Sequence, residues 1–392
     1  MRIVAWIAVA LAAGACREPA ARPPAIRFLH TFGPQETELF NTTMAERGIA
    51  VESLLAPFAR GQQVISEILH AQNCPDLIRI DATWLPGLVA GGLLAEAPAA
   101  LVALDWTPEA AALAQLDGVW WSLPQSVDGL IVIHDVETPA PASPSLADLL
   151  AAARAARART GPYPLGIRVD GYWFVPWLRD EGGELAAPEG IAGEGAVRAM
   201  TRLAALFGDL VPPPPPSGSE DPEEMRRWDA HEVAYVITGP WQFAGLRDRA
   251  RIAVSPLAHA PRGGQLLVVP RCAKHPGDGW RLAGELTSLL VEARFADAFA
   301  AVPTRRAALD AAPALYRAAE AALAGAAMLP RVPVTPLLFD DLQPALWAVV
   351  AGDATADEAV AGVRRGWQRL TKPVARPAAR PAAGPALAPE AR

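Results

Sequence analysis

The hydrophobic pattern begins with an apolar segment unlike any other in the chain. Arg2 is followed by an uninterrupted apolar run over residues 3–12. This run has about the length of a signal-peptide core and falls well short of the roughly 20 apolar residues that a transmembrane helix needs. No later stretch approaches that length, so the pattern predicts an exported chain with a soluble mature part.

Downstream of this segment, short apolar runs alternate with helical patterns. We expect strands over residues 26–30, 49–54 and 76–80, and helices over residues 36–46 and 62–71. Strands and helices that alternate in this way favour a parallel sheet covered by helices. The first part of the mature chain is therefore predicted to fold as an α/β unit.

The same two patterns continue through the rest of the chain. Further strands are expected over residues 130–134, 233–237, 252–255 and 265–270, and further helices over residues 84–91, 146–159 and 280–300 and, with interruptions, to residue 367. Ser145 directly precedes the second of these helices and is a typical N-cap residue. Two Pro/Ala-rich segments flank the folded part, and we interpret residues 16–25 as a flexible tether and residues 372–392 as a disordered tail.

Length and charge restrict the class of protein. A chain of 392 residues is long enough for two domains of ordinary size. The net charge of −7 arises from interspersed acidic and basic residues, which argues against a nucleic-acid partner. Tryptophan, with 12 residues, outnumbers both tyrosine and phenylalanine. Flat apolar rings of this kind stack on sugars, although core packing must account for several of them.

Of the three cysteines, we consider Cys16 separately from Cys74 and Cys272. Small residues directly before Cys16 resemble a bacterial lipobox. In a lipobox the thiol is acylated and the preceding peptide, here residues 1–15, is removed. The alternative is an ordinary signal peptide with an incidental cysteine. If Cys16 carries lipid, Cys74 and Cys272 remain as an even pair for which a disulfide is allowed outside the cytoplasm. The histidines are scattered singly, so we expect no metal site and no cofactor.

Six segments, taken in order, resemble a known family. They are PDLIRIDATWLPGLVAGGLL from Pro75, PQSVDGLIVIH from Pro124, WFVPWLRDEGGEL from Trp173, VITGPW from Val236, AVSPLAHAPRGGQLLVVP from Ala253 and MLPRVPVTPLLFDDLQPALWAVVAGDATADEAV from Met328. Together they cover about residues 26–371. They resemble the extracellular solute-binding proteins of ABC transporters, specifically the sugar-binding, maltose/trehalose-binding-like type.

The resemblance implies a two-lobed periplasmic-binding-protein-like α/β fold. Each lobe would be a mostly parallel sheet flanked by helices, with the ligand cleft between the lobes. Residues 26–129 and 253–303 would form lobe 1, and residues 130–252 and 304–371 would form lobe 2. Ligand that contacts both lobes would favour their closed arrangement.

The resemblance also makes a prediction about the two remaining cysteines. It places the strand at residues 265–270 antiparallel to the strand at residues 76–80. Facing residues of an antiparallel pair have numbers with a constant sum, and this sum is 346 if Cys74 faces Cys272. The same register would place Asp81 opposite Gln265 at the cleft end. Two unpaired chance cysteines are the alternative.

In the first lobe, the resemblance implies five ligand-binding residues, and four of them have a structural alternative. They are Gln35, Glu36, Asp81, Trp84 and Asp128. Glu36 could instead stabilise the N-terminus of its own helix, and Asp81 could be the N-cap of the next one. Trp84 could seat that helix, and the Asp-Gly pair at Asp128 is also a common turn signal.

Five more residues complete the expected site. Trp173 and Trp241 are expected platforms in the second lobe, and Gly264 would let backbone approach the ligand closely. Gln265 stands where relatives often carry tryptophan, so the ligand is expected to differ from maltose or trehalose. Arg305 matches a second-lobe arginine of the family, although spacing allows Arg306 equally.

The expected function is capture of a carbohydrate and its delivery to an ABC permease. The expected protein is a monomer in the cell envelope, lipid-anchored to a membrane, and not an enzyme. Two alternatives remain: a lipoprotein of the same fold that signals ligand presence to a membrane partner, and a glycoside hydrolase, which also combines carboxylates with tryptophans.

Overall fold

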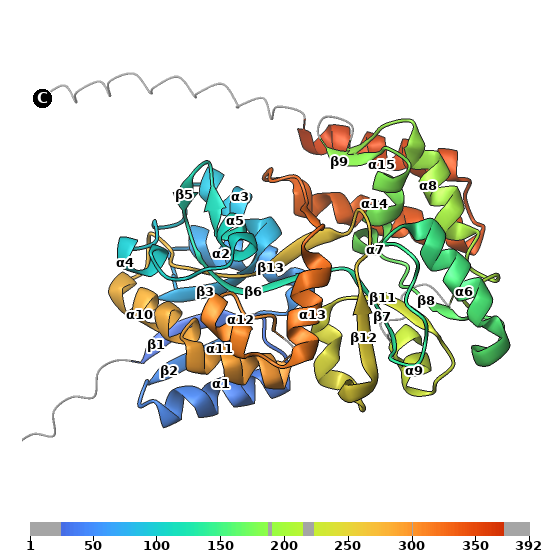
Figure 1. The fold of residues 1–392 in the computed structure, drawn as a ribbon. Coiled ribbons are helices and arrows are strands. Elements are labelled where there is room, and N and C mark those ends of the chain that lie inside the picture. The colour runs from blue at the N-terminus through green and yellow to red at the C-terminus, as the bar shows by residue number, and fades with distance from the viewer. Residues whose placement is uncertain (1–24, 187–189, 215–222, 300, 372–392) are drawn as a thin grey trace, which may run out of the picture.

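The computed structural model describes residues 25–186, 190–214, 223–299 and 301–371. The expected signal segment, Cys16, residues 17–24 of the tether and the tail at residues 372–392 lie outside the described residues. Two α/β bodies lie side by side, one containing the blue N-terminal elements and the other the green elements and the red C-terminal helices (Figure 1).

The first body is built on a six-stranded sheet. Its strands are β1 (Ile26–His30), β2 (Val51–Leu55), β3 (Leu77–Asp81), β6 (Leu123–Gly129), β13 (Pro261–Val268) and β14 (Ala327–Met328), in the order β14-β13-β3-β1-β2 with β6 also paired to β13. Its helices are α1 (Pro34–Glu46), α2 (Gly61–His70), α3 (Leu85–Ala90), α4 (Ala99–Val102), α5 (Pro108–Ala114), α10 (Pro276–Leu286), α11 (Leu289–Phe299) and α12 (Arg306–Ala311). Short elements complete it: the 3-10 turns η1 (Phe58–Arg60) and η2 (Ala82–Trp84) and the hairpin of β4 (Gln115–Leu116) and β5 (Val119–Trp120).

This sheet is covered on both faces. Phe28 and Leu77 belong to one apolar cluster, which also contains residues of α1, α10 and α11. Leu29 and Ile78 belong to a larger cluster that continues into the second body. Because successive strand residues point to opposite faces, a strand buried on both faces is apolar throughout. This explains why most positions of β1 and β3 are apolar, although β1 also contains Arg27 and His30 and β3 also contains Arg79 and Asp81.

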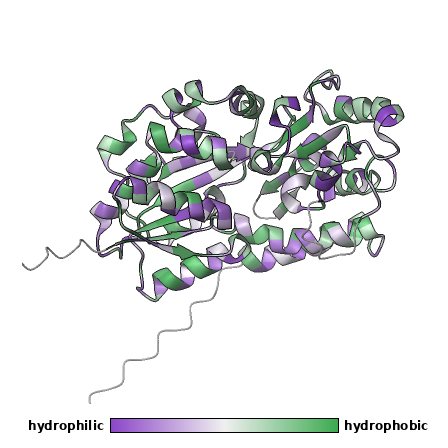
Figure 2. Cartoon of the chain, turned by 90° about the horizontal axis from the view of Figure 1, so that it is seen from below, coloured by the Kyte–Doolittle hydropathy of each residue, from purple (hydrophilic) through white to green (hydrophobic). Residues whose placement is uncertain are grey.

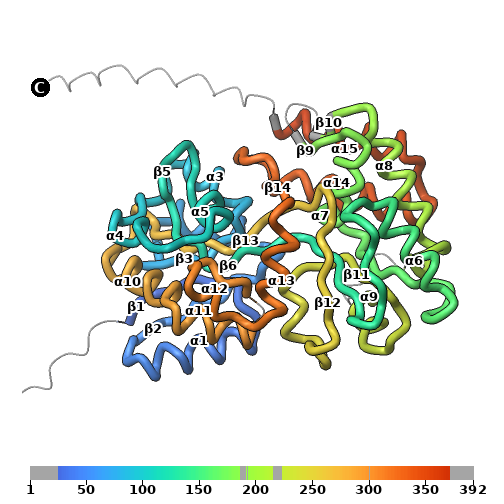
Figure 3. Tube along the Cα trace, viewed as in Figure 1, coloured from blue at the N-terminus to red at the C-terminus, as the bar shows by residue number. Residues whose placement is uncertain are grey.

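The second body contains a four-stranded sheet. Its strands are β7 (Ile131–Asp135), β8 (Leu165–Gly166), β11 (Tyr235–Thr238) and β12 (Ile252–Ser255), in the order β12-β7-β11-β8. Its other elements are α6 (Leu146–Thr160), α7 (Gly171–Asp180), α8 (Gly195–Ala204), α9 (Glu223–Asp229), α14 (Thr335–Ala351), α15 (Ala356–Thr371), the strands β9 (Glu184–Ala186) and β10 (Gly190–Ala192), and the 3-10 turns η3 (Pro240–Gly245) and η4 (Arg249–Arg251). Helix α13 (Ala314–Leu323) lies at the junction and packs against β6, β7 and β12 (Figure 3).

The expectation of mostly parallel sheets needs correction, above all in the second body. Strand β7 is antiparallel to both β11 and β12, and only β11 and β8 are parallel. In the first body, β13 is antiparallel to both β3 and β6. The reason is that the chain crosses between the bodies before β7 and before β13. Each of these two strands therefore lies antiparallel to its neighbours β11 and β12 or β3 and β6.

Two segments also differ from the expected lobe boundaries. The segment 253–303 was expected in the first lobe, but its beginning belongs to β12 and pairs in the second sheet. Residues 304–311 were expected in the second lobe, but they stay with the first body, because Arg305 pairs with Trp106 and α12 packs against α11. Local sequence gives no indication of β7 as the partner of β12 or of Trp106 as the partner of Arg305, because both lie far away along the chain.

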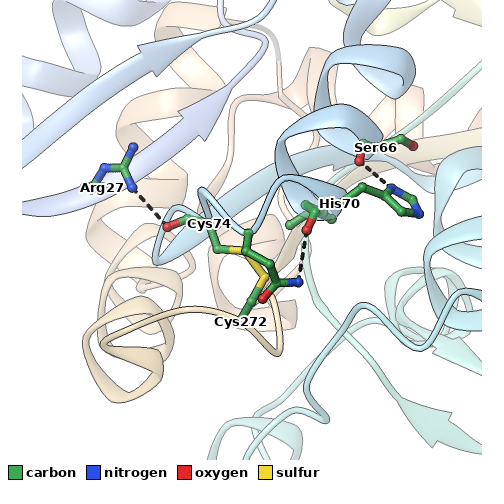
Figure 4. The surroundings of a disulfide bond; sticks show 7 residues. Arg27, Ser66, His70, Cys74 and Cys272 are labelled. Atoms are coloured by element: carbon green, nitrogen blue, oxygen red, sulfur yellow. Dashed lines mark hydrogen bonds between the residues drawn. A yellow bond between two sulfur atoms is a disulfide. The ribbon is translucent and has the colours of Figure 1, made fainter. Parts of the chain in front are cut away.

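The expected disulfide is confirmed. Cys74 and Cys272 are bonded, with their Cα atoms 5.8 Å apart (Figure 4). The register between β3 and β13 is also the expected one, because Gln265 pairs with Asp81. Arg27 of β1 donates a hydrogen bond of 3.0 Å to the carbonyl of Cys74 and thereby connects the disulfide with β1, the strand next to β3.

The outer helices mix hydrophilic and hydrophobic positions (Figure 2). This is the pattern of surface helices that bury one face. Among the described residues, no helix is long and apolar enough to cross a membrane.

Candidate binding site

Three neighbouring strands of the first sheet bring polar side chains together at one end. Gln265 of β13 pairs with Asp81 of β3 on one side and with Ser126 of β6 on the other, and Gly263 pairs with Asp128. The amide Nε2 of Gln265 donates a hydrogen bond of 3.3 Å to Oδ2 of Asp81. Gln265 is 8% exposed, and its Oε1 has no hydrogen-bond partner in the described part of the chain.

Asp81 has the structural role that the sequence offered as an alternative. Its Oδ1 accepts hydrogen bonds from the Thr83 amide (2.9 Å) and the Thr83 hydroxyl (2.5 Å), and so caps η2. Desolvation raises the pKa of the Asp81 carboxyl, whereas the bonds from Thr83, the charge of Arg79 and the bond from Gln265 lower it. The cap uses Oδ1, and Oδ2 is left with the long bond to Gln265.

Asp128 lies against the glycine pair of β13. A Cβ atom at Gly263 would stand 2.8 Å from Oδ1 of Asp128 and 3.4 Å from Oη of Tyr172, so any larger residue here would displace the Asp128 carboxylate from its position. At Gly264 a Cβ atom would stand 2.2 Å from the Ser126 carbonyl oxygen, so this glycine is required by strand packing. Desolvation, with repulsion from Asp81, raises the pKa of Asp128 to about 7, although Arg79 opposes the rise.

Arg79 is a member of the cluster that the sequence analysis missed. It is two residues before Asp81 in β3 and therefore shares its face of the sheet. Its guanidinium donates to Oε1 of Gln125 (2.6 Å) and to the Thr31 hydroxyl (2.7 Å) and lies 4.7 Å from the ring centroid of Phe32. Desolvation lowers its pKa, and the nearby carboxylates oppose this. A charged residue within an otherwise apolar strand was the available signal.

The two residues expected at the start of α1 differ in their surroundings. Oε2 of Glu36 accepts a hydrogen bond of 2.6 Å from the Gly33 amide, which makes Glu36 part of a capping box. Its charge also acts on Arg79, so Glu36 belongs to the cluster as well as to the cap. Gln35 is exposed, and no side-chain contact connects it with the cluster among the described residues.

The second body contributes aromatic rings. Tyr172, Trp173 and Trp241 form a group with ring centroids 5.9–6.4 Å apart. Trp173 is only 6% exposed and donates to the Ile237 carbonyl at 2.7 Å, so it supports the group from behind. Trp241 is half-buried, and Tyr172 donates to the Pro261 carbonyl of β13 at 3.3 Å. Tyr172, which the sequence analysis missed, therefore connects the aromatic group with the polar cluster.

A further pair of aromatic residues, Phe58 and Trp84, lies in η1 and η2. Trp84 is 7% exposed and packs so closely on Gly61 that a Cβ atom there would lie 2.5 Å from the indole ring. Trp84 thus packs against α2, whereas the structural alternative concerned the helix that starts directly after Trp84, α3. Phe58, another residue missed from the sequence, lies over Trp84 at 5.6 Å and is 54% exposed. Phe58 lies just after the C-terminal end of β2, and Asp81 is the C-terminal residue of β3, so both lie at the same edge of the parallel part of the sheet.

Arg305 lies outside this cluster, and its expected place in the second lobe is wrong. It forms a salt bridge with Asp105 and lies 5.5 Å from the ring centroid of Trp106, both in the first body. A cavity of about 630 Å³ between β12 and α13 also contains none of the expected site residues. Its lining is mainly apolar, and Arg249 on its wall donates to the carbonyl of Asp297.

Comparison with known proteins gives a clear result only at the level of structure. No family model matches the sequence, and no curated protein matches it. The GacH receptor of Streptomyces glaucescens GLA.O, solved unliganded and in complex with acarbose, superposes with a TM-score of 0.77 at 22% identity, over 88% of this chain and 98% of that chain. Maltose-bound MalE3 of T. maritima gives a TM-score of 0.75 at 18% identity, over 88% and 100% of the two chains.

An ABC transporter solute-binding protein from Thermotoga lettingae TMO, bound with α-D-tagatose, is also similar. Its TM-score is 0.73 at 19% identity, over 89% of this chain and 100% of that chain. These likenesses confirm the expected fold, a two-lobed α/β architecture of the periplasmic-binding-protein type. At such low identity they show the fold and leave the ligand open.

Proposed function

We propose that this protein is an extracytoplasmic solute-binding lipoprotein that captures a carbohydrate and delivers it to an ABC importer. One observation carries the proposal: the polar cluster of the first sheet meets the aromatic group of the second body at Gly263. Carboxylates and amides pair with sugar hydroxyls, and aromatic faces stack on the C–H surfaces of sugar rings. A sugar held here would contact both bodies and favour their closed arrangement.

Within this proposal, the expected site residues fall into three groups. Asp81, Asp128 and Gln265 would bind hydroxyls directly, with Glu36 and the newly found Arg79 beside them. Trp241 would provide the stacking face, supported by Trp173, and Gly264 and Trp84 would hold the surrounding backbone and helix in place. Gln35 and Arg305 have no contact with the cluster, so we assign them no part in binding.

The arrangement of the carboxylates favours a binder over a glycoside hydrolase. A hydrolase of this kind needs two carboxyl groups that flank the scissile bond from different sides. Asp81 and Asp128 come from strands of one sheet, separated only by β13, so they would face a ligand from the same side. A binding protein requires no such pair and no activated nucleophile.

Anchoring and delivery are further parts of the proposal. Acylated Cys16 would become the mature N-terminus, and the Pro/Ala-rich tether would keep the two lobes near a permease in the membrane. Uptake of the ligand by cells would then depend on Cys16, and a Cys16→Ala protein would be released from the membrane fraction. If uptake persists without the protein while ligand-dependent gene expression is lost, the sensing alternative holds instead.

A thermal-shift screen of the mature protein with sugars and polyols tests the binding proposal. We expect stabilisation by a mono- or oligosaccharide with micromolar affinity, which corresponds to about −8 kcal/mol. Asp81→Ala and Trp241→Ala should weaken this binding, whereas Glu38→Gln, on the exposed side of α1, should not. Stabilisation by a different class of solute, with none by any carbohydrate, would contradict the sugar assignment.

A further inference from the structure

We propose that the site prefers a sugar that carries a positive charge, such as an amino sugar, over a neutral sugar of the same size. This inference rests on the proposed function, because it specifies the ligand of the same site. It comes from the balance of charges and of hydrogen-bond donors and acceptors in the polar cluster.

Acidic groups outnumber basic groups in the cluster. Three carboxylates, from Glu36, Asp81 and Asp128, surround one guanidinium, that of Arg79. Among the described residues, no basic nitrogen lies within 4.0 Å of an oxygen of these three carboxylates, so none of them forms an ion pair. Arg79 gives its donors to the uncharged oxygens of Gln125 and Thr31 instead. Its charge reduces the excess of negative charge without pairing with any one carboxylate.

Other nearby cations are already committed elsewhere. Arg262 of β13 donates to the carbonyls of Leu323 (2.7 Å) and Ala324 (3.1 Å). Arg179 of α7 pairs with Glu184 at 3.0 Å. Two more titratable groups stand at the start of α7, and neither is a cation. Desolvation raises the pKa of Tyr172 and that of Asp170, the N-cap of α7. The second body thus adds no free cation to the cluster from α7.

The cluster also has more acceptors than donors. Oε1 of Gln265, in a side chain that is more than nine-tenths buried, has no donor within the described part of the chain. The Asp128 carboxylate beside it is half-buried. Desolvated acceptors of this kind are unfavourable until a donor reaches them. An ammonium group supplies three N–H donors and a positive charge, whereas a hydroxyl group supplies one donor and carries no charge.

The aromatic group of the second body is consistent with the same ligand. The Tyr172 hydroxyl and Asp128 both lie next to Gly263, and the Trp241 ring is 6.4 Å from the Tyr172 ring. Aromatic faces attract cations as well as sugar rings. A ligand that combines a ring with an ammonium group would therefore satisfy both halves of the site.

Calorimetric titration with matched sugars tests this preference. The probes are neutral mono- and disaccharides, their 2-amino-2-deoxy and 6-amino-6-deoxy derivatives, and the N-acetylated forms of these amines, which have nearly the same shape without the charge. We expect at least one amine to bind about tenfold or more tightly than both its neutral and its acetylated counterpart.

Two variants connect the preference to the cluster. Asp128→Asn and Asp81→Asn keep the shape of the side chain, and asparagine also serves as an N-cap, so η2 should survive. Each should reduce the preference for the amine at least severalfold, whereas Glu38→Gln should leave it unchanged; thermal unfolding confirms that each variant is folded.

The outcomes separate the two proposals. If neutral sugars bind as tightly as every amine, or if both asparagine variants keep the full preference, the inference is wrong while the proposed function stands. If no sugar of any kind binds, both are wrong.

Discussion

The two ends of the β3–β13 strand pair are built in opposite ways. At one end, Cys74 and Cys272 are covalently bonded, and the buried Asp76 accepts hydrogen bonds from the amides of Arg27 (3.0 Å) and His275 (3.2 Å). At the other end, Oε1 of Gln265 is buried and has no hydrogen-bond partner among the residues that the structure describes. One end of the strand pair is cross-linked and has its buried carboxylate hydrogen-bonded. The other end is polar and keeps a buried acceptor without a donor among the described residues.

The difference shows how the site can retain groups that are unfavourable on their own. Desolvated carboxylates and amides destabilise a fold, so their positions must be held by other interactions. The cross-linked end fixes the register of the same two strands and thereby fixes Asp81 opposite Gln265.

Burial alone does not identify such a site. Glu292 of α11 is 3% exposed, and burial raises its pKa to about 7, as at Asp128. Yet Glu292 accepts hydrogen bonds from the Thr304 amide (3.1 Å), the Thr304 hydroxyl and the Arg305 amide (3.0 Å). Its carboxylate is fully used in holding the segment that follows α11. Missing partners, more than a raised pKa, distinguish the candidate site.

The largest expected effect separates the two ends of the strand pair. Replacing both Cys74 and Cys272 by alanine removes a cross-link that spans 198 positions, and we expect the free energy of unfolding to fall by about 4 kcal/mol. Ligand affinity should change less than about twofold, because the altered end is remote from the site. Denaturant unfolding and calorimetry measure the two quantities. A comparable loss of affinity would show that the ends are coupled.

The next test concerns Glu292, a buried carboxylate that accepts hydrogen bonds from neighbouring residues. Glu292→Ala should lower the free energy of unfolding by about 3 kcal/mol, because it leaves several buried donors unpaired. Glu292→Gln retains an acceptor oxygen and should lose less. If Glu292→Ala lowered the free energy of unfolding no more than Asp128→Asn does, the two carboxylates would not differ in their hydrogen bonding as we infer.

The pH dependence of stability should reveal Asp128 directly. Its pKa is about 7 in the folded protein and 3.8 as the reference value, so the folded state holds the proton more tightly. This contribution to stability is fully present below 3.8 and is lost as the pH rises through about 7. The full shift corresponds to about 4 kcal/mol. Because Asp128 is only half-buried and water screens part of its interactions, we expect Asp128→Asn to gain about 2 kcal/mol relative to the wild type between acidic and mildly alkaline pH. Thermal or urea unfolding across that range measures the gain, and a difference independent of pH would contradict it.

The smallest expected effect concerns the exposed rim of the polar end. Phe58→Ala should weaken the binding of an oligosaccharide by about 1 kcal/mol through loss of a stacking face. Stability should hardly change, since the ring is 54% exposed. Leu55→Ala, at an exposed residue of the same strand end, is the matched control. Equal losses for both variants would argue against stacking on Phe58.

The sequence predicted elements well where the pattern is local. The strands at residues 26–30 and 252–255 and the helix that begins after Ser145 lie where the alternation and capping signals placed them. Strand β6 was not expected, because PQSVDG has the turn residues of a loop and becomes a strand only by pairing with β13. Arg305 was misplaced for a similar reason, since its partner Asp105 is 200 positions away.

By itself, the sequence determined the alternating elements and, with the resemblance to solute-binding proteins, the single register that joins Cys74 to Cys272 and sets Asp81 opposite Gln265. These follow from side-chain periodicity and from the constant sum of an antiparallel pair, which are arithmetic along the chain. Only the tertiary structure decided that β12 joins the second sheet, that Arg79 enters the acidic cluster and that Tyr172 reaches β13 beside Asp128. Those contacts depend on how the two bodies pack, and packing joins residues whose local sequences give no sign of each other.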